Sequence, residues 1–113
     1  MEAIAEDQRS ATVSGEVDAA RWKGIRLKRL PRGASLGVEL EVDGTVELLL
    51  LEERAFRRFP EHQSPAFSSR VVERMGVSMK IPASGDYYLI LDNRAGDDKR
   101  AFTITISAAP PGG

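Results

Sequence analysis

His62 is the only histidine in this 113-residue chain, so a catalytic triad or a histidine-based metal site would have to use it. The segment around it contains Pro60, Gln63 and Pro65, which predicts a loop. The sequence has no Gly-x-Ser-x-Gly motif to present a nucleophilic serine, and it has no cysteine. Because a catalytic base needs a positioned partner, we expect an exposed loop histidine and no enzymatic activity.

Oxygen-bearing side chains gather near the C-terminus, at Asp92, Asn93, Asp97 and Asp98. Oxygen donors packed this closely can hold calcium. Their spacing does not match the Asp-x-Asp-x-Asp-Gly loop, and basic side chains compete for the same carboxylates: Arg94, Lys99 and Arg100. We interpret the cluster as a hairpin turn capped by Asp and Asn side chains, and we expect no metal and no cofactor.

The densest basic stretch of the chain runs from Arg21 to Arg32 and includes Trp22. A tryptophan among cations could stack on a single nucleic-acid strand or bind an anionic lipid. Against this, Glu39, Glu41 and Glu47 are expected as cross-strand neighbours that neutralise the stretch. The formal net charge of the chain is only −1, which gives no field to attract a polyanion. We therefore expect neither nucleic-acid binding nor membrane binding.

A second group of residues combines arginine with phenylalanine, and its members are Arg54, Phe56, Arg57, Arg58 and Phe59. Arginine and aromatic residues are enriched at the energetic centres of protein interfaces, so these five are the candidate binding residues. The alternative is a short helix near 52–59, ended by Pro60, that caps the fold with its aromatic side inward and its arginines outward.

These residues must be positioned by strands, because apolar and polar residues alternate over much of the chain. From Leu36 to Val42 every second residue is apolar, which is typical of a half-buried strand. Asp43 and Gly44 then form the strongest short hairpin signal, so we expect a type I′ turn with a positive φ at Gly44. The run from Leu48 to Leu51 has no alternation, which indicates a strand covered on both faces.

Further strands are expected on the same grounds, and their ranges are 11–17, 21–30, 70–74, 77–81, 87–91 and 101–106. With the central pair this gives seven or eight short strands, the number expected for an all-β antiparallel sandwich. The predicted core residues are Leu40, Leu48, Ile81, Leu89, Phe102 and Ile104. We expect a polar leader with weak helical propensity over 1–10, one sandwich domain over 11–107, and a flexible tail or linker start over 108–113.

The C-terminal third carries a resemblance to a known family. The stretch IPASGDYYLILDN from Ile81 to Asn93, followed by FTITI from Phe102 to Ile106, resembles the closing strands of bacterial pre-peptidase C-terminal domains. The resemblance implies a jelly-roll-like β-sandwich. Members are usually attached to secreted proteases, and some bind calcium through acidic residues near their start. Here only Glu16 and Asp18 stand in that region, so no calcium site is carried over.

These observations predict a non-catalytic binding module that presents loops on a rigid sandwich, with another protein or a second copy as partner. The alternative is a structural subunit of a homo-oligomeric shell or particle, since jelly rolls also build such assemblies. The N-terminal MEAIAEDQRS lacks the basic start and apolar core of a signal peptide, and the longest apolar run, Tyr87 to Leu91, is too short to span a membrane. The expected location is therefore the cytoplasm.

Overall fold

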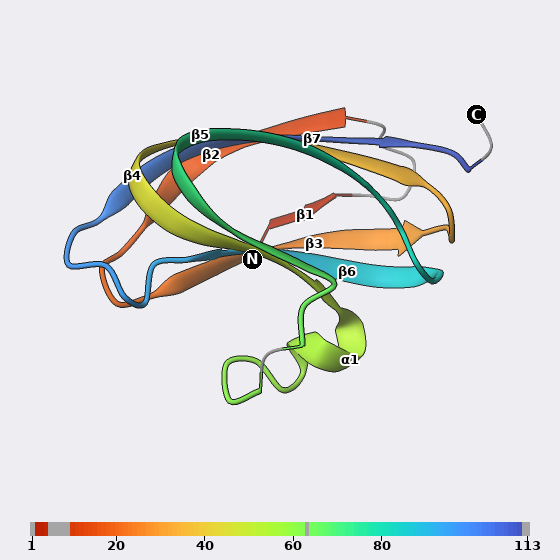
Figure 1. The fold of residues 1–113 in the computed structure, drawn as a ribbon, viewed down its shortest axis with the longest axis horizontal. Helices are drawn as coiled ribbons and strands as arrows, with labels where there is room; N and C mark the ends of the chain where they lie inside the picture. The colour runs from red at the N-terminus through yellow and green to blue at the C-terminus, as the bar shows by residue number, and fades with distance from the viewer. Residues whose placement is uncertain (1, 5–9, 63, 112–113) are drawn as a thin grey trace.

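A computed structural model describes residues 2–4, 10–62 and 64–111, and within them the chain is almost entirely β-structure (Figure 1). The strands and the single helix of this described part are β1 (Glu2–Ile4), β2 (Ser10–Val17), β3 (Trp22–Leu30), β4 (Ser35–Glu52), α1 (Glu53–Phe56), β5 (Phe67–Lys80), β6 (Gly85–Asp92) and β7 (Arg100–Ala109). The predicted all-β class with one short helix is confirmed. None of the described helices is long and apolar enough to cross a membrane.

The long strand β4 organises the fold, because it changes its neighbour halfway along. Its first half pairs antiparallel with β7 from Ser35 to Val42, and its second half pairs antiparallel with β6 from Glu47 to Glu52. β5 follows β4 along the opposite edge through both halves. One layer is therefore β5–β4–β7–β2 and the other is β5–β4–β6–β3–β1, so a single curled sheet forms both sides of the sandwich (Figure 1).

The hairpin expected at Asp43 and Gly44 is absent, because β4 continues through these two residues as one strand. They form the corner of β4, the point at which its neighbouring strand changes from β7 to β6. The Asp43 Oδ1 atom accepts a 3.0 Å hydrogen bond from the Ala101 backbone N–H. A Cβ atom on Gly44 would lie 2.5 Å from Cζ of Arg100, so a larger residue at this position would require the Arg100 guanidinium to move. The left-handed residue of the corner is Glu73 on β5, with φ +66°.

Two further expectations about strand boundaries differ from the structure. The strands predicted on either side of Gly76 are one strand, β5, which follows the whole of β4. Within the predicted polar leader, Glu2–Ile4 forms β1 and pairs parallel with β3, so this piece is not helical. The rest of residues 1–9 lies outside the described residues.

The hydrophobic core lies between the two layers, and its predicted members are all buried. Leu40, Leu48, Leu89 and Ile104 have no exposed surface, while Ile81 and Phe102 are 1% and 5% exposed. A second, smaller apolar cluster lies on the outer face of the β4–β6–β3 layer, and its buried members are Leu49, Leu51, Phe59, Tyr88 and Ile90. The prediction that residues 48–51 are covered on both faces is therefore confirmed.

Asp86 ties the start of β6 to the end of β3. Its Oδ1 atom accepts a 2.8 Å hydrogen bond from the backbone N–H of Arg29, and its Oδ2 atom accepts hydrogen bonds from Nε and Nη2 of Arg26 at 3.1 and 2.5 Å. The Arg29 N–H, followed by the Arg26 guanidinium, holds the pKa of Asp86 below its ordinary value. Folding therefore favours the ionised carboxylate.

This arrangement makes part of the stability depend on pH. Because the folded pKa of Asp86 is lowered, its contribution is complete above the unfolded pKa of about 3.9 and disappears as the pH falls through the folded value. We expect Asp86→Asn to lower the melting temperature at pH 7, and the difference from wild type to shrink as the pH falls below about 4. Exposed Asp97→Asn is the control. A difference for Asp86→Asn that stays constant over this range would contradict the assignment.

The corner at Gly44 gives a second prediction. Gly44→Ala should destabilise the protein by about 1 kcal/mol or less, because the new methyl group displaces the Arg100 guanidinium, which is the end of a flexible side chain. Arg100→Ala in the same chain should remove most of that cost, which chemical denaturation of the double-mutant cycle would measure. Gly76→Ala is the control, since its Cβ would meet only Glu39 Cγ at 4.0 Å. A turn with positive φ at Gly44 would instead leave the cost unchanged in the Arg100→Ala background.

Candidate functional site

The segment that follows β4 folds into a short helix and then a turn. Helix α1 comprises Glu53–Phe56 and begins directly after the last residue of β4. The Arg57 N–H donates to the Glu53 carbonyl at 3.1 Å, and Arg57 also forms a 3.2 Å ion pair with the Glu53 side chain. The helix predicted near 52–59 is shorter than expected, because residues 57–60 form turns in place of a further helical turn before Pro60.

The two phenylalanines of this segment point toward the sheet. The Phe56 ring stacks on Tyr88 with centroids 3.9 Å apart and planes 7° apart. Trp22 packs edge-on against both, with centroid distances of 5.9 Å to Phe56 and 5.1 Å to Phe59. Phe59 is only 7% exposed. These aromatic contacts fix α1 on the outer face of β3 and β6. Both phenylalanines therefore lie between the sheet and the outward side of the segment.

Arg94 also holds the segment in place, through a contact with Phe59. Its Cζ atom lies 4.8 Å from the centroid of the Phe59 ring, a cation–π distance. Its Nε and Nη2 atoms donate to Oδ1 and Oδ2 of Asp92 at 2.9 and 2.8 Å, and this hydrogen bonding raises the pKa of Arg94. This role of Arg94 is not predicted from the sequence, where Arg94 is expected only to compete for the carboxylates. The Asp92-x-Arg94 spacing was the available signal.

The acidic cluster beyond β6 also has a structural role. Asn93 is 2% exposed, and its Nδ2 atom donates to the backbone carbonyls of Val17, Asp18 and Asp98 at 3.3, 3.1 and 2.9 Å. It therefore joins the loop after β2 to the loop before β7. In the described part of the chain, no group of three or more histidine, aspartate or glutamate residues is placed to hold a metal ion.

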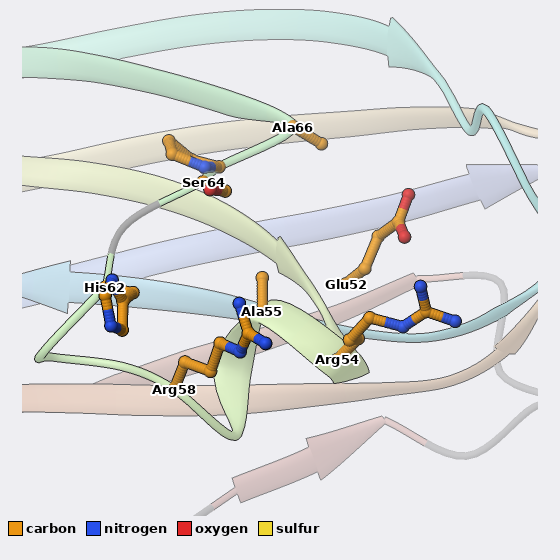
Figure 2. Close-up of a pocket in the computed structure, with 8 residues that line it drawn as sticks. Glu52, Arg54, Ala55, Arg58, His62, Ser64 and Ala66 are labelled. Carbon is orange, nitrogen blue, oxygen red and sulfur yellow. The ribbon is translucent and has the colours of Figure 1, made fainter.

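Two arginines of the segment, Arg54 and Arg58, border a pocket of about 310 Å³ (Figure 2). Its lining residues are Glu52, Arg54, Ala55, Arg58, His62, Ser64, Pro65 and Ala66. The side chains of Arg54 and Arg58 leave α1 in different directions, with Glu52 on the side of Arg54 and His62 on the side of Arg58 (Figure 2). Arg57 does not line the pocket, since it pairs with Glu53.

Arg54 and Arg58 combine a place beside the pocket with a lack of side-chain partners in the described part of the chain, which they share with other exposed arginines such as Arg32 and Arg70. Both are exposed, and no hydrogen bond or ion pair joins either side chain to another residue of the described ranges. By contrast, Arg26 pairs with Asp86 and Arg74 pairs with Glu41. Two guanidinium groups with all their N–H donors available can bind carboxylates or carbonyl groups of another molecule.

His62 lies at the rim of this pocket and is exposed, as expected. Over residues 10–62 and 64–111, no hydrogen bond links its ring to a carboxylate or a hydroxyl group, so no catalytic triad is assembled there. The pocket thus offers binding groups, and the described residues around it include no oriented acid–base pair.

The expected neutralisation of the basic stretch on β3 is wrong in its details. Glu39 and Glu41 lie opposite β5 and β7, and Glu47 lies opposite β5 and β6, so none of the three is a neighbour of β3. β3 pairs with β6 and β1 instead, and Asp86 on β6 neutralises Arg26. The alternation of charges along the chain did not reveal which strands are adjacent.

Comparison with known proteins gives matches at the level of structure alone. No protein-family model and no curated protein sequence matches the chain. The periplasmic inhibitor of g-type lysozyme PliG from Aeromonas hydrophila matches with 15% identity and a TM-score of 0.71, over 96% of this chain and 95% of that one. PliG from Salmonella Typhimurium matches with 17% identity and a TM-score of 0.61, over 96% and 99%.

The pre-peptidase C-terminal domain of a collagenase from Bacillus anthracis also matches, with 16% identity and a TM-score of 0.54, over 96% of this chain and 93% of that one. The predicted resemblance to these domains is thereby confirmed at the level of the fold, which is a pre-peptidase-C-terminal-like β-sandwich. The expected cytoplasmic location is contradicted. The finding against it is that the PliG proteins of similar fold are periplasmic.

The packing of the segment gives a prediction. Phe59→Ala should destabilise the protein by about 3–5 kcal/mol, because it removes a buried ring that contacts both Trp22 and Arg94. Arg57→Ala, which breaks only an exposed ion pair, should leave the stability nearly unchanged. Urea denaturation of the two variants measures both effects. Equal, small effects would show that the aromatic contacts do not hold α1 in place.

Proposed function

We propose that this chain is a non-catalytic protein-binding module that works in the periplasm or outside the cell. Its contact surface is the outward side of the segment after β4, formed by Arg54, Arg57, Arg58 and His62 and called the α1 surface below. The observation that carries the proposal is the state of Arg54 and Arg58, which border a pocket and have no partner within the described residues.

The support beneath these arginines favours binding. An interface loses affinity when side chains and backbone must be ordered on association. Here the backbone of the segment is already fixed by the stacking of Phe56 on Tyr88 and by the burial of Phe59. The ordering cost on binding is then limited mainly to the side chains of Arg54 and Arg58.

The charge of the segment indicates the kind of partner. Three glutamates, Glu52, Glu53 and Glu61, stand beside the three arginines, so the segment carries both signs in equal number. Such a surface suits a protein partner that offers individual carboxylates to Arg54 and Arg58. A polyanion would meet the glutamates as well and lose much of its attraction.

The comparisons support this proposal in two ways. The PliG proteins that share the fold are inhibitors of g-type lysozyme, so a sandwich of this shape serves elsewhere to bind a protein without catalysis. They are also periplasmic. We therefore suggest a purified g-type lysozyme as the first partner to test, before extracts of the cells that produce the chain.

The test reverses the two unpartnered charges. Arg54→Glu with Arg58→Glu should lower binding by at least about 30-fold, as expected when two anchoring interactions of about 1 kcal/mol or more each are lost. Its melting temperature should stay close to that of wild type, since exposed arginines contribute little to stability. Biolayer interferometry with immobilised protein measures the binding to lysozyme or to a partner captured from extract.

Arg32→Glu with Arg70→Glu is the matched control, because both residues are exposed arginines on other parts of the sandwich. It should bind like wild type. Equal loss in both double variants would indicate a general charge effect, and equal binding by all three proteins would remove the α1 surface from consideration.

A further inference from the structure

The two long edge strands of the sandwich differ in how they are protected. β5 pairs only with β4, and β2 pairs only with β7, so each has one free edge within the described residues. A free edge presents unpaired backbone N–H and carbonyl groups to any other strand. Proteins usually guard such an edge with charged side chains, proline, or an irregular backbone that interrupts pairing.

β5 has these protections. It carries exposed Arg70, Arg74 and Lys80 along its length, and Glu73 interrupts the strand with a φ of +66°. Its pairing with β4 also shifts register at this point. A second strand could not follow β5 over its whole length without meeting the irregularity and the like charges.

β2 has none of these edge protections between Ser10 and Gly15. This stretch, SATVSG, contains no charged residue and no proline, and every residue of it pairs in regular register with β7. Ala11 and Val13 on its inner side are half-buried, so they keep apolar surface in contact with solvent. The stretch is thus a regular, uncharged edge that another strand can join.

The outer side of the same stretch is already ordered. Thr12 forms a 3.1 Å hydroxyl hydrogen bond with Thr105, and Ser14 forms one of 3.0 Å with Thr103. These bonds join β2 to β7 at the level of the side chains as well as the backbone. β2 is therefore held in the shape that a pairing strand requires, which limits the ordering cost of association.

We infer that a second copy of this chain pairs with β2, antiparallel and related by a two-fold axis at Val13. In an antiparallel pair, directly opposite residues lie on the same face, so inner residues must meet inner residues. Centring the pair on Val13 satisfies this condition, because Val13 meets its own copy and Ala11 meets Gly15. Thr12 then faces Ser14, and Glu16 faces Ser10, so no like charges are opposed.

A corresponding two-fold pairing of β5 with its own copy brings like charges together, and for this reason we place the contact on β2. A two-fold axis at Val77, the middle of the regular half of β5, would place Arg74 directly opposite Lys80 of the second copy. Two cations at that spacing repel each other. Self-pairing centred on Val13 therefore opposes no like charges on β2, whereas self-pairing centred on Val77 opposes two cations on β5.

Pairing at β2 would leave the α1 surface accessible. β2 ends the β5–β4–β7–β2 layer, whereas α1 lies on the outer face of the opposite layer (Figure 1). A dimer formed in this way joins two four-stranded layers into one continuous sheet and presents two α1 surfaces. If a partner offers two sites, such a dimer binds it more tightly than the monomer does.

The first test measures the mass of the purified chain in solution by light scattering coupled to size exclusion. Wild type should have twice the mass of one chain, and Thr12→Lys with Ser14→Lys should have the mass of a single chain, since lysines at the join repel one another. Ser68→Lys with Ser78→Lys places the same charges at exposed positions of β5 and should remain dimeric. All three should share one melting profile at low concentration.

The second test determines the register. Because the chain has no cysteine, single cysteines report contacts without interference. Thr12→Cys and Ser14→Cys chains should form a disulfide-linked dimer when mixed and oxidised with dissolved oxygen and a copper catalyst. Each variant alone should not, because identical positions would stand about 8 Å apart, beyond the reach of a disulfide.

A monomeric wild type over the concentrations tested would overturn the inference, and so would dimers that survive the lysines on β2. Loss of dimer with the β5 lysines would place the contact on the other edge. Crosslinking of Ser14→Cys alone would exclude the Val13-centred register. These outcomes do not depend on the α1 surface, since α1 lies on the opposite layer (Figure 1).

Discussion

The change of neighbours along β4 is the constraint on which the rest of the structure depends. A strand buried between β5 and β7 in its first half must bend to lie between β5 and β6 in its second half. At the level of the bend, Glu73 interrupts β5 with a positive φ, and the pairing of β5 with β4 shifts register between Glu41 and Thr45. Both layers of the sandwich share this corner, so their inner faces meet around Leu40 and Leu48.

The same bend explains why the chain needs the segment after β4. The second half of β4 lies in the middle of its layer, so it presents apolar side chains on both faces, with Leu48 and Leu50 inward and Leu49 and Leu51 outward. The outward pair must be covered, and the rings of Phe56 and Phe59 belong to the same cluster. Covering them fixes α1, and the arginines between the aromatic residues are thereby presented to solvent.

The alternation of residue types was sufficient to predict the class of fold and the buried positions, because burial on one face of a strand repeats every second residue. Leu36–Val42 and Ala101–Ile106 follow this rule. The pattern failed at Asp43 and Gly44, where the local turn preference was outweighed by the pairing of β4 with β5 and β7 before these residues and with β5 and β6 after them. It also failed for Arg94, since its contact with Phe59 depends on the folded arrangement of β6 and α1. Local sequence preferences cannot predict either effect, because both depend on residues that are distant in the chain.

The two interpretations of the arginine–phenylalanine segment are compatible, because they concern opposite sides of one element. The aromatic side has the packing of a core: Phe56 lies flat on Tyr88, and Phe59 lies between Trp22 and Arg94. The arginine side has the exposure of a contact surface. A cap that is required for stability has a fixed backbone, and a fixed backbone presents Arg54 and Arg58 in a reproducible arrangement. Folding therefore already orders the backbone of this segment, whereas a flexible loop would lose that conformational entropy each time it bound a partner.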